Sequence, residues 1–361
     1  MIESFNANHL MSVLSRLLLT PQSEGAAHDV EIAEMGREQF ESLLALANLN
    51  HVTMRAMKVL LEAMRSAGDG LRAEWAASAL GAEGERIENA VSFLRAICSA
   101  LDAAGCNVTV IKSLDHWPDL GSDLDLYTGS GVEEVSKVMK RNFGAQLASR
   151  SWGDRLAGKW NFIVPGLPEP VEIHMGRLGQ TGEQASIAAS LPARSRRIEI
   201  DGHDFRVPSA SDRLMVSTLQ RMYRHFFFRL CDVVDTVELS ESGLIDYQDL
   251  QRSAEAAGIW EGVATYLVIV SDYVERYREE GLNLPQSVKA SARFGGSELY
   301  FRQDFLRVPI LPQSASLYGL QLSGLLRKRE LHSSARLSLL PWLATAAAVG
   351  QKLTGSDKGI W

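Results

Sequence analysis

The sequence predicts an α+β protein in which a mixed β-sheet module lies between two helical lobes. Three observations support this class. Apolar residues recur at helical spacing up to about residue 102, short strand-like segments separated by turn residues follow, and helical spacing returns after residue 208. We therefore divide the chain into an N-terminal helical lobe (1–104), an α/β module (105–207) and a C-terminal helical lobe (208–361).

The N-terminal lobe carries two sets of apolar residues at helical spacing, with a break at Gly68-Asp69-Gly70 between them. Gly105 lies just past the second set and predicts the end of that helix. Residues 22–36 are less apolar, and we interpret them as a loop or a weak helix. The two sets are Phe40, Leu43, Leu44, Ala47, Met57, Leu60, Leu61 and Met64, and then Ile87, Val91, Leu94, Cys98 and Leu101.

The central module alternates strand candidates with turns. Residues 132–143 predict a helix, and Asp201-Gly202 is a strong hairpin signal between two strand candidates. In the C-terminal lobe, Ser209 or Ser211 can cap one continuous helix that runs to residue 239. The strand candidates are 108–111, 123–127, 146–151, 160–164, 171–175, 197–200 and 203–207, and later helices are expected at 246–257, 260–280, 313–328 and 335–350.

Composition narrows the class of protein. The chain has 361 residues, 46% of them hydrophobic and 22% charged, as in globular proteins, and its net charge of −7 argues against a broad nucleic-acid-binding surface. Its three cysteines have no metal-ligand spacing, which favours a reduced, cytoplasmic compartment. The start of the chain does not read as a signal peptide.

The most apolar late segment is 337–350, which Pro341 interrupts. It is too short to cross a bilayer comfortably, so we expect no membrane span. A core helix is the preferred interpretation of this segment, and a membrane-surface or partner contact is the alternative.

The most informative stretch is 108–127, VTVIKSLDHWPDLGSDLDLY. A buried strand ends at Lys112-Ser113, a turn and a short helix follow, and then Asp123 and Asp125 alternate with leucines. Because side chains of a strand alternate between its two faces, both carboxylates point the same way. Two neighbouring carboxylates repel each other unless a cation neutralises them, and a divalent metal ion is the simplest such cation.

This pattern resembles the nucleotidyltransferase superfamily that includes DNA polymerase beta, and in particular its uncharacterised bacterial nucleotidyltransferase-like members. In that superfamily a strand ends in Gly followed by Gly or Ser, a short helix follows, and the next strand carries Asp-x-Asp. A further acid lies on a later strand. The spacing from Ser113 to Asp123 fits, whereas Lys112-Ser113 departs from the superfamily's glycine. The resemblance covers residues 105–207.

The resemblance implies an NTP-dependent enzyme, ATP among the candidate substrates, that uses two Mg²⁺ (or Mn²⁺) ions to transfer an NMP. Asp123, Asp125 and Glu172 would be the metal ligands and catalytic residues, with Glu169 and Glu183 as weaker alternatives for the third acid. Glu172 would also serve as general base, directly or through its metal. The acceptor is open: a small molecule, a protein or an RNA end.

Several further residues are candidates for nucleotide binding. Lys112 and Ser113 would contact the β- and γ-phosphates, with the Ser113 hydroxyl and backbone N–H as donors. Ser122 would orient a carboxylate or contact a phosphate, and Lys159 precedes the strand candidate at 160–164. For His174 two interpretations stand: contact with phosphate or acceptor, or a hydrogen-bonded structural histidine.

The predicted helix after Ser209 carries a polar stripe. Arg221, His225, Arg229, Asp232 and Asp235 recur every three or four residues, beside an aromatic block. This stripe either is a solvated face or faces the active cleft, with Arg221 or His225 near the nucleotide and the aspartates holding the arginines.

Two rival functions remain open. The first is a noncatalytic nucleotide-binding or regulatory protein that keeps the fold, which the Lys112-Ser113 turn favours. The second is a toxin-like transferase that modifies tRNA ends. Motifs of other chemistries are missing from the sequence, among them the dinucleotide-binding and P-loop glycine patterns, the nucleophile elbow and zinc-ligand spacings.

Overall fold

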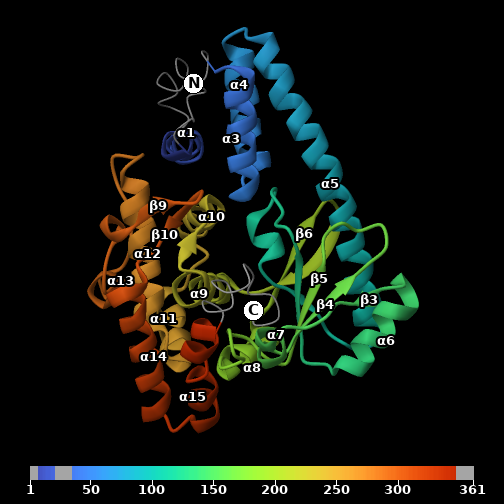
Figure 1. Cartoon of the computed structure of the whole chain (residues 1–361), viewed down its shortest axis with the longest axis vertical. Coiled ribbons are helices and arrows are strands. Elements are labelled where there is room, and N and C mark those ends of the chain that lie inside the picture. Colours follow the sequence, from blue (N-terminus) through green and yellow to red (C-terminus); the bar gives the residue numbers. More distant parts are fainter. Residues whose placement is uncertain (1–6, 21–34, 347–361) are drawn as a thin grey trace.

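The structure is a computed structural model that describes residues 7–20 and 35–346. It confirms a mixed α+β protein in which helices flank a mixed sheet (Figure 1). The N-terminal helices are α1 (Ala7–Leu19), α3 (Arg37–Leu49), α4 (Thr53–Ser66) and α5 (Gly70–Ala103). Most of the segment 22–36, predicted as a loop or weak helix, lies outside the described residues.

The predicted break at Gly68-Asp69-Gly70 is confirmed. Gly68 has a φ of 74°, in the left-handed region that glycine adopts without strain, and Asp69 caps α5 by accepting a hydrogen bond from the Arg72 N–H at 3.1 Å. Helix α5 is 34 residues long and runs from the N-terminal helices down to the sheet, as Figure 1 shows.

The central sheet has the strand order β1-β2-β5-β4-β3. Strands β2 and β5 are parallel neighbours, and the other pairs are antiparallel. The β2–β5 register places Asp125 beside Glu172 and Tyr127 beside His174. The strands are β1 (Thr109–Val110), β2 (Leu124–Thr128), β3 (Gln146–Leu147), β4 (Lys159–Ile163) and β5 (Val171–Met175).

The helices of the module are η2 (Ser113–His116), α6 (Val132–Phe143), α7 (Trp152–Ala157) and α8 (Ala185–Arg194). The predicted hairpin is confirmed as β6 (Arg196–Ile200) and β7 (His203–Val207), which pair only with each other. The strand predicted at 146–151 is shorter, because α7 begins at Trp152 with Ser151 as its N-cap.

The prediction of one continuous helix after Ser209 is wrong. Helix α9 (Ala210–Gln220) continues as the π-helical turn η3 (Arg221–His225) and stops at Phe226, whose φ is 55°. The aromatic block then forms β8 (Phe227–Phe228), and α10 (Leu230–Glu241) begins after Arg229. The polar stripe is therefore not one helical face.

Tertiary pairing explains this break. Strand β8 pairs with β10 (Phe305–Arg307), which in turn pairs with β9 (Tyr300–Arg302). The rings of Phe227 and Phe305 stack with centroids 4.4 Å apart. Aromatic residues fit a paired strand better than a helix interior, and the partner strand lies far along the chain.

The later helices match the predictions at 246–257, 260–280 and 313–328. Over its described part, 337–350 is not the expected core helix: Leu337 is buried, but Trp342 is 75% exposed. The remainder, 347–350, lies outside the described residues. The helices are α11 (Tyr247–Ala257), α12 (Trp260–Glu275), α13 (Gln286–Ser291), α14 (Ala315–Arg327) and α15 (Leu331–Leu337), and helical residues follow at 340–346.

The packing groups the chain into two hydrophobic cores. One core joins the N-terminal helices to the C-terminal helices, with Ala73 and Ala76 of α5 among its members. The other core is that of the sheet module and takes in the second half of α5, from Ile87 to Leu101. The predicted ranges 1–104, 105–207 and 208–361 follow the order of elements, whereas α5 belongs to both cores.

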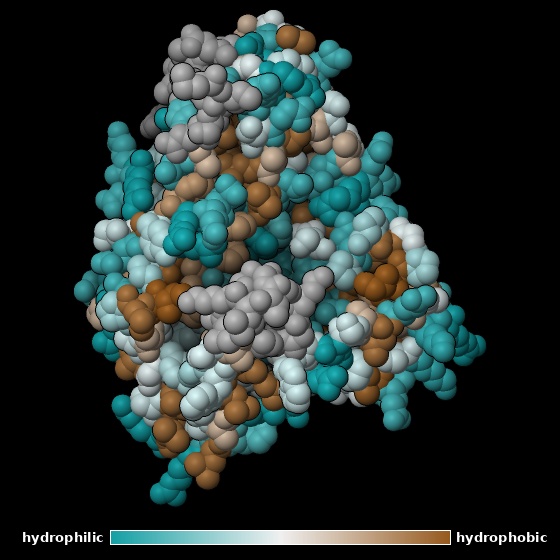
Figure 2. Space-filling model, in the orientation of Figure 1, coloured by the Kyte–Doolittle hydropathy of each residue, from teal (hydrophilic) through white to brown (hydrophobic). Residues whose placement is uncertain are grey.

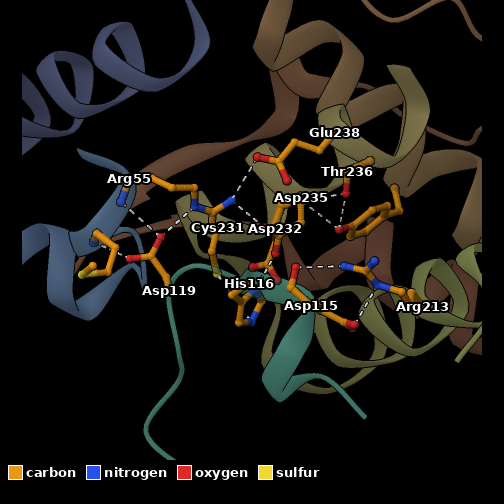
Figure 3. A network of polar contacts seen from close by, with 12 residues as sticks. Arg55, Asp115, His116, Asp119, Arg213, Cys231, Asp232, Asp235, Thr236 and Glu238 are labelled. Carbon is orange, nitrogen blue, oxygen red and sulfur yellow. Dashed lines mark hydrogen bonds and ion pairs between the residues drawn. The ribbon is translucent and has the colours of Figure 1, made fainter. Parts of the chain in front are cut away.

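A buried ion-pair network ties these parts together (Figure 3). Arg55 of α4 contacts Asp119 and Asp235 at 2.7 Å each, and Asp235 also pairs with His116. Arg213 of α9 contacts Asp115 at 2.7 Å. The network therefore joins α4, the η2 segment and the C-terminal lobe beside the candidate site.

In the described part of the chain, no helix is both long and apolar enough to span a bilayer. On the face in Figure 2, hydrophobic residues form separate groups among hydrophilic ones.

Candidate functional site

The structure brings the predicted site residues to one cavity of about 190 Å³ between the sheet module and the C-terminal lobe. Nine of the ten predicted residues line it, and the tenth, His174, forms a hydrogen bond with Glu172. The lining residues are His51, Lys112, Ser113, His116, Gly121, Ser122, Asp123, Asp125, Lys159, Glu172, Gln220, Arg221, Arg224, His225 and Arg229.

The acids share one wall of the cavity because β2 and β5 are parallel neighbours. Asp125 and Glu172 are register partners, and both are buried, with 4% and 5% exposure. Asp123 directly precedes β2, two residues before Asp125, and lines the same cavity. The residue between them, Leu124, points into the module core, so packing of the leucines fixes the direction of the carboxylates.

Two lysines and a histidine contact the buried carboxylates. Lys112 contacts Asp125 through its Nζ and lies 3.6 Å from Glu172 Oε1. Lys159 Nζ lies 2.6 Å from Glu172 Oε2, and His174 Nε2 lies 2.8 Å from Glu172 Oε1. His174 is therefore in contact with the site's carboxylates, as a hydrogen-bond partner that orients Glu172.

The carboxylates differ in how they hold a proton. The Asp125 carboxylate, together with burial, raises the pKa of Asp123 to about 6. Burial alone would raise the pKa of Glu172, but Lys112, His174 and Lys159 hold it well below its usual value. Glu172 is thus held as a carboxylate between its basic neighbours.

The backbone at Lys112 is strained. Its φ of 64° and ψ of −55° are those of a classic γ-turn, and the Ser113 N–H donates to the Ile111 carbonyl at 2.7 Å across it. Such a conformation costs about 1–3 kcal/mol in a residue other than glycine. The turn places the Lys112 ammonium group against the Asp125 carboxylate.

The predicted role of Ser113 needs correction. Its hydroxyl accepts a hydrogen bond from the Asp125 N–H at 2.7 Å and donates to the Asp123 carbonyl at 3.3 Å. Its own N–H is used in the γ-turn. Both groups that the sequence suggested for phosphate binding therefore form hydrogen bonds inside the protein: the hydroxyl fastens the turn to β2, and the N–H closes the γ-turn. Ser122, in contrast, is exposed at the cavity.

The opposite wall is basic and comes from the interruption between α9 and α10. Arg221 is buried and held by Asp232, with Nε 2.8 Å from the carboxylate, so this aspartate anchors an arginine as one interpretation foresaw. Arg229 Nε is buried and makes no hydrogen bond within the described residues. Burial, with Arg224, Arg221 and Arg229 nearby, holds the pKa of His225 well below its usual value.

Sequence reasoning missed several lining residues, among them Arg224. Arg229, a member of the predicted polar stripe, comes to the cavity after the helix breaks at Phe226, and that break depends on pairing with a distant strand. His51 and His116 had no motif in their own segments. Gly121-Ser122, directly before Asp123, was the one local signal that the turn into β2 borders the site.

The donor set fits a hard divalent cation such as Mg²⁺, since carboxylate oxygens dominate it. Asp125, Glu172 and His174 bring their ligand atoms within 4.8 Å of one another. Asp125 Oδ1 is buried and makes no hydrogen bond within the described residues. The Lys112 ammonium forms an ion pair with this oxygen. Asp123, Asp125 and Glu172 would hold the metal, and Lys112 now supplies the neutralising charge.

Replacing Lys112 is expected to strengthen binding of Mg²⁺. Two unit charges about 4 Å apart interact by about 1 kcal/mol in water and about 4 kcal/mol at an effective dielectric constant of 20. Lys112→Met removes the competing ammonium, so the Mg²⁺ dissociation constant should fall at least about fivefold. Isothermal titration with MgCl₂ measures it. Lys140→Met, at an exposed position on α6, is the control, and an unchanged affinity in Lys112→Met would contradict the competition.

Comparison with known proteins does not identify a family. No protein-family model matches the chain, and no curated protein matches it significantly. The functional argument therefore depends on the cavity itself.

Proposed function

We propose that the chain is a metal-dependent nucleotidyltransferase that transfers an NMP from an NTP to an acceptor. One observation carries this proposal: the cavity has three carboxylates on its sheet wall and an excess of basic residues around them. The basic residues are Lys112, Lys159, Arg221, Arg224 and Arg229. A polyphosphate that carries a divalent cation needs this combination, because the cation binds the acids and the phosphates bind the arginines.

The arginines favour an anionic ligand for a specific reason. Arg221 has its own carboxylate, whereas Arg224 and Arg229 form no ion pair within the described residues. The Arg229 Nε is buried without a hydrogen bond within the described residues, which is costly, and a phosphate oxygen would satisfy it. The cavity thus has a preference for negative charge although the whole chain carries a net charge of −7.

The chemistry follows from these positions. The acceptor oxygen attacks the α-phosphorus of the NTP, its new bond to phosphorus forms, and the bond to the β-phosphate oxygen breaks as pyrophosphate leaves. Mg²⁺ held by the three acids would neutralise the phosphates and activate the acceptor oxygen. Glu172, which His174 and Lys159 hold in place, would take the acceptor's proton directly or through its metal. Lys112, Arg224 and Arg229 would hold the leaving pyrophosphate.

Loss of the unpaired arginine is expected to weaken nucleotide binding. A hydrogen bond to a charged group contributes about 1.5–3 kcal/mol, so Arg229→Gln should raise the NTP dissociation constant about 10- to 100-fold. Equilibrium binding of a fluorescent NTP analogue in the presence of Mg²⁺ measures this. Arg252→Gln, on the exposed face of α11, should bind as the wild type does. If Arg229→Gln, Arg252→Gln and the wild type bound the NTP analogue with equal affinity, Arg229 would not be a nucleotide-binding residue.

The proposal as a whole is tested by incubating the protein with each α-³²P-labelled NTP and MgCl₂ in the presence of candidate acceptors. Small metabolites, total cellular protein and total RNA are the three acceptor pools. Covalent attachment of the label to one pool supports the proposal and identifies the acceptor class. Labelled RNA would favour the alternative of an enzyme that modifies tRNA ends. No attachment in any pool would contradict it.

One observation favours the noncatalytic alternative. Lys112 already neutralises Asp125, so the acids do not require a metal for the chain to fold. In that case the protein would bind an NTP tightly, with the same dependence on Arg229, and no label would be transferred.

A further inference from the structure

A second group of potential metal ligands lies outside the three acids, and two of its members line the same cavity. Ligand atoms of His51, His116 and Cys231 all lie within 4.8 Å of one another. These residues come from three separate parts of the chain: the turn between α3 and α4, the short helix η2, and the first turn of α10. The proposed nucleotide chemistry uses none of them.

Hydrogen bonds of Asn50 bring two of these segments together. The Asn50 side-chain oxygen accepts from the Leu230 N–H at 3.0 Å, and its backbone carbonyl accepts from the Cys231 N–H at 3.2 Å. The next residue, His51, has a φ of 53°, in the left-handed region. Histidine is among the residues that tolerate this region, and the conformation directs the chain into α4 immediately beside Cys231.

His116 is oriented like a metal-binding histidine. Its Nδ1 pairs with the Asp235 carboxylate, which Arg55 holds in turn, and its Nε2 lies 3.8 Å from Cys231 Sγ. Figure 3 shows His116 among these residues. A carboxylate on one ring nitrogen fixes the ring and leaves the other nitrogen for a metal, as in carboxylate–histidine–zinc arrangements.

His51 adds an unused donor. Its Nδ1 is buried and makes no hydrogen bond within the described residues. A buried imidazole nitrogen without a hydrogen-bond partner is available to bind a metal ion.

We propose that His51, His116 and Cys231 bind a thiophilic divalent metal ion of the Zn²⁺ class. Imidazole nitrogen and thiolate sulfur select such ions, whereas Mg²⁺ prefers oxygen. The metal takes the place of the proton between His116 Nε2 and Cys231 Sγ, and that proton is released to solvent. Three protein ligands leave one position for water or a ligand oxygen, and His51 and His116 both line the cavity.

The site would bridge the N-terminal helices, the sheet module and the C-terminal lobe, because each contributes one ligand. It lies beside the proposed nucleotide cavity but uses different residues from the Mg²⁺ site, so either site can exist without the other.

The same residues also suggest a Cys-His-Asp nucleophile, and burial argues against it. Cys231 is fully buried, with 0% exposure, and does not line the cavity. A nucleophile must reach a substrate atom. A metal ion needs only a path of its own size.

Titration with CoCl₂ of protein first treated with a chelator tests the proposal. A Co²⁺–thiolate charge-transfer absorption should appear and saturate at one Co²⁺ per chain, and ZnCl₂ should remove it. Cys231→Ser should abolish this absorption, and His51→Ala should weaken Co²⁺ binding at least about 100-fold. His51→Ala stays informative if Cys231→Ser does not fold, since the His51 side chain makes no hydrogen bond through Nδ1.

Cys98→Ser and His203→Ala are the matched controls and should bind Co²⁺ as the wild type does, because both residues lie away from the cavity. Asp125→Asn should also bind it normally, which separates this site from the proposed nucleotide site. No thiolate absorption in the wild type, or full absorption in His51→Ala, would overturn the proposal. A second result would also overturn it: iodoacetamide alkylates Cys231 rapidly, and saturating ZnCl₂ does not slow that alkylation.

Discussion

Asp125→Asn is expected to lower magnesium-dependent nucleotide transfer by about 10³-fold or more while the protein stays folded. The carboxylate is the central one of the three acids, and the amide that replaces it neither carries charge nor holds Mg²⁺ well. The change is nearly isosteric, so the β2–β5 register and the buried leucines beside it are unaffected. Asp123→Asn should have an effect of the same kind. Initial rates with α-labelled NTP, together with circular dichroism of each variant, measure both.

The matched control is Glu134→Gln, which neutralises an exposed carboxylate on α6, away from the cavity. It should transfer nucleotide at the wild-type rate. If Asp125→Asn or Asp123→Asn kept more than about a tenth of the activity, the carboxylates would not be metal ligands and the two-metal assignment would fail.

Arg55→Leu is expected to lower the free energy of unfolding by about 3–5 kcal/mol, the cost of removing one partner from a buried ion pair. Arg55 is 10% exposed and contacts Asp119 and Asp235, whose side chains are 1% and 8% exposed. Its removal leaves two carboxylates buried with less neutralising charge. Urea denaturation followed by tryptophan fluorescence measures the loss, provided that unfolding is two-state.

Arg65→Leu lies on the same helix at an exposed position and should change the free energy of unfolding by no more than about 0.5 kcal/mol. A loss below about 1 kcal/mol in Arg55→Leu would show that the network in Figure 3 does not hold α4 to the module and to α10. Because the network also holds His116, the same variant tests whether the second metal site depends on it.

The acids could be predicted from sequence because their signal is local. Asp123 and Asp125 alternate with leucines, and Glu172 interrupts an apolar strand in the same way, so period-two patterning assigns each side chain to a face. The resemblance supplied the expectation of a further acid on a later strand, and the β2–β5 register places Glu172 beside Asp125. The hairpin and most helices also followed from local spacing and turn residues.

Arg221 and His225 of the other wall were predicted near the nucleotide, but the course of the backbone there could not be predicted, because long-range contacts determine it. The helical spacing through Arg221 to Asp235 is real in the sequence, yet pairing of β8 with β10 interrupts the helix at Phe226. The same interruption brings Arg229 to the cavity and places Cys231 at the start of α10. Likewise, the cysteines showed no zinc spacing, since His51, His116 and Cys231 meet only through the fold.

The most direct test of the central claim compares two labels on the same nucleotide. The protein is incubated with MgCl₂ and either α-³²P- or γ-³²P-labelled NTP in the presence of the acceptor pool that gives the strongest signal. Nucleotidyl transfer predicts that the α-label becomes attached to the acceptor and that the γ-label is released as pyrophosphate, with both signals lost in Asp125→Asn. Attachment of the γ-label instead, or attachment of neither label, would contradict the account.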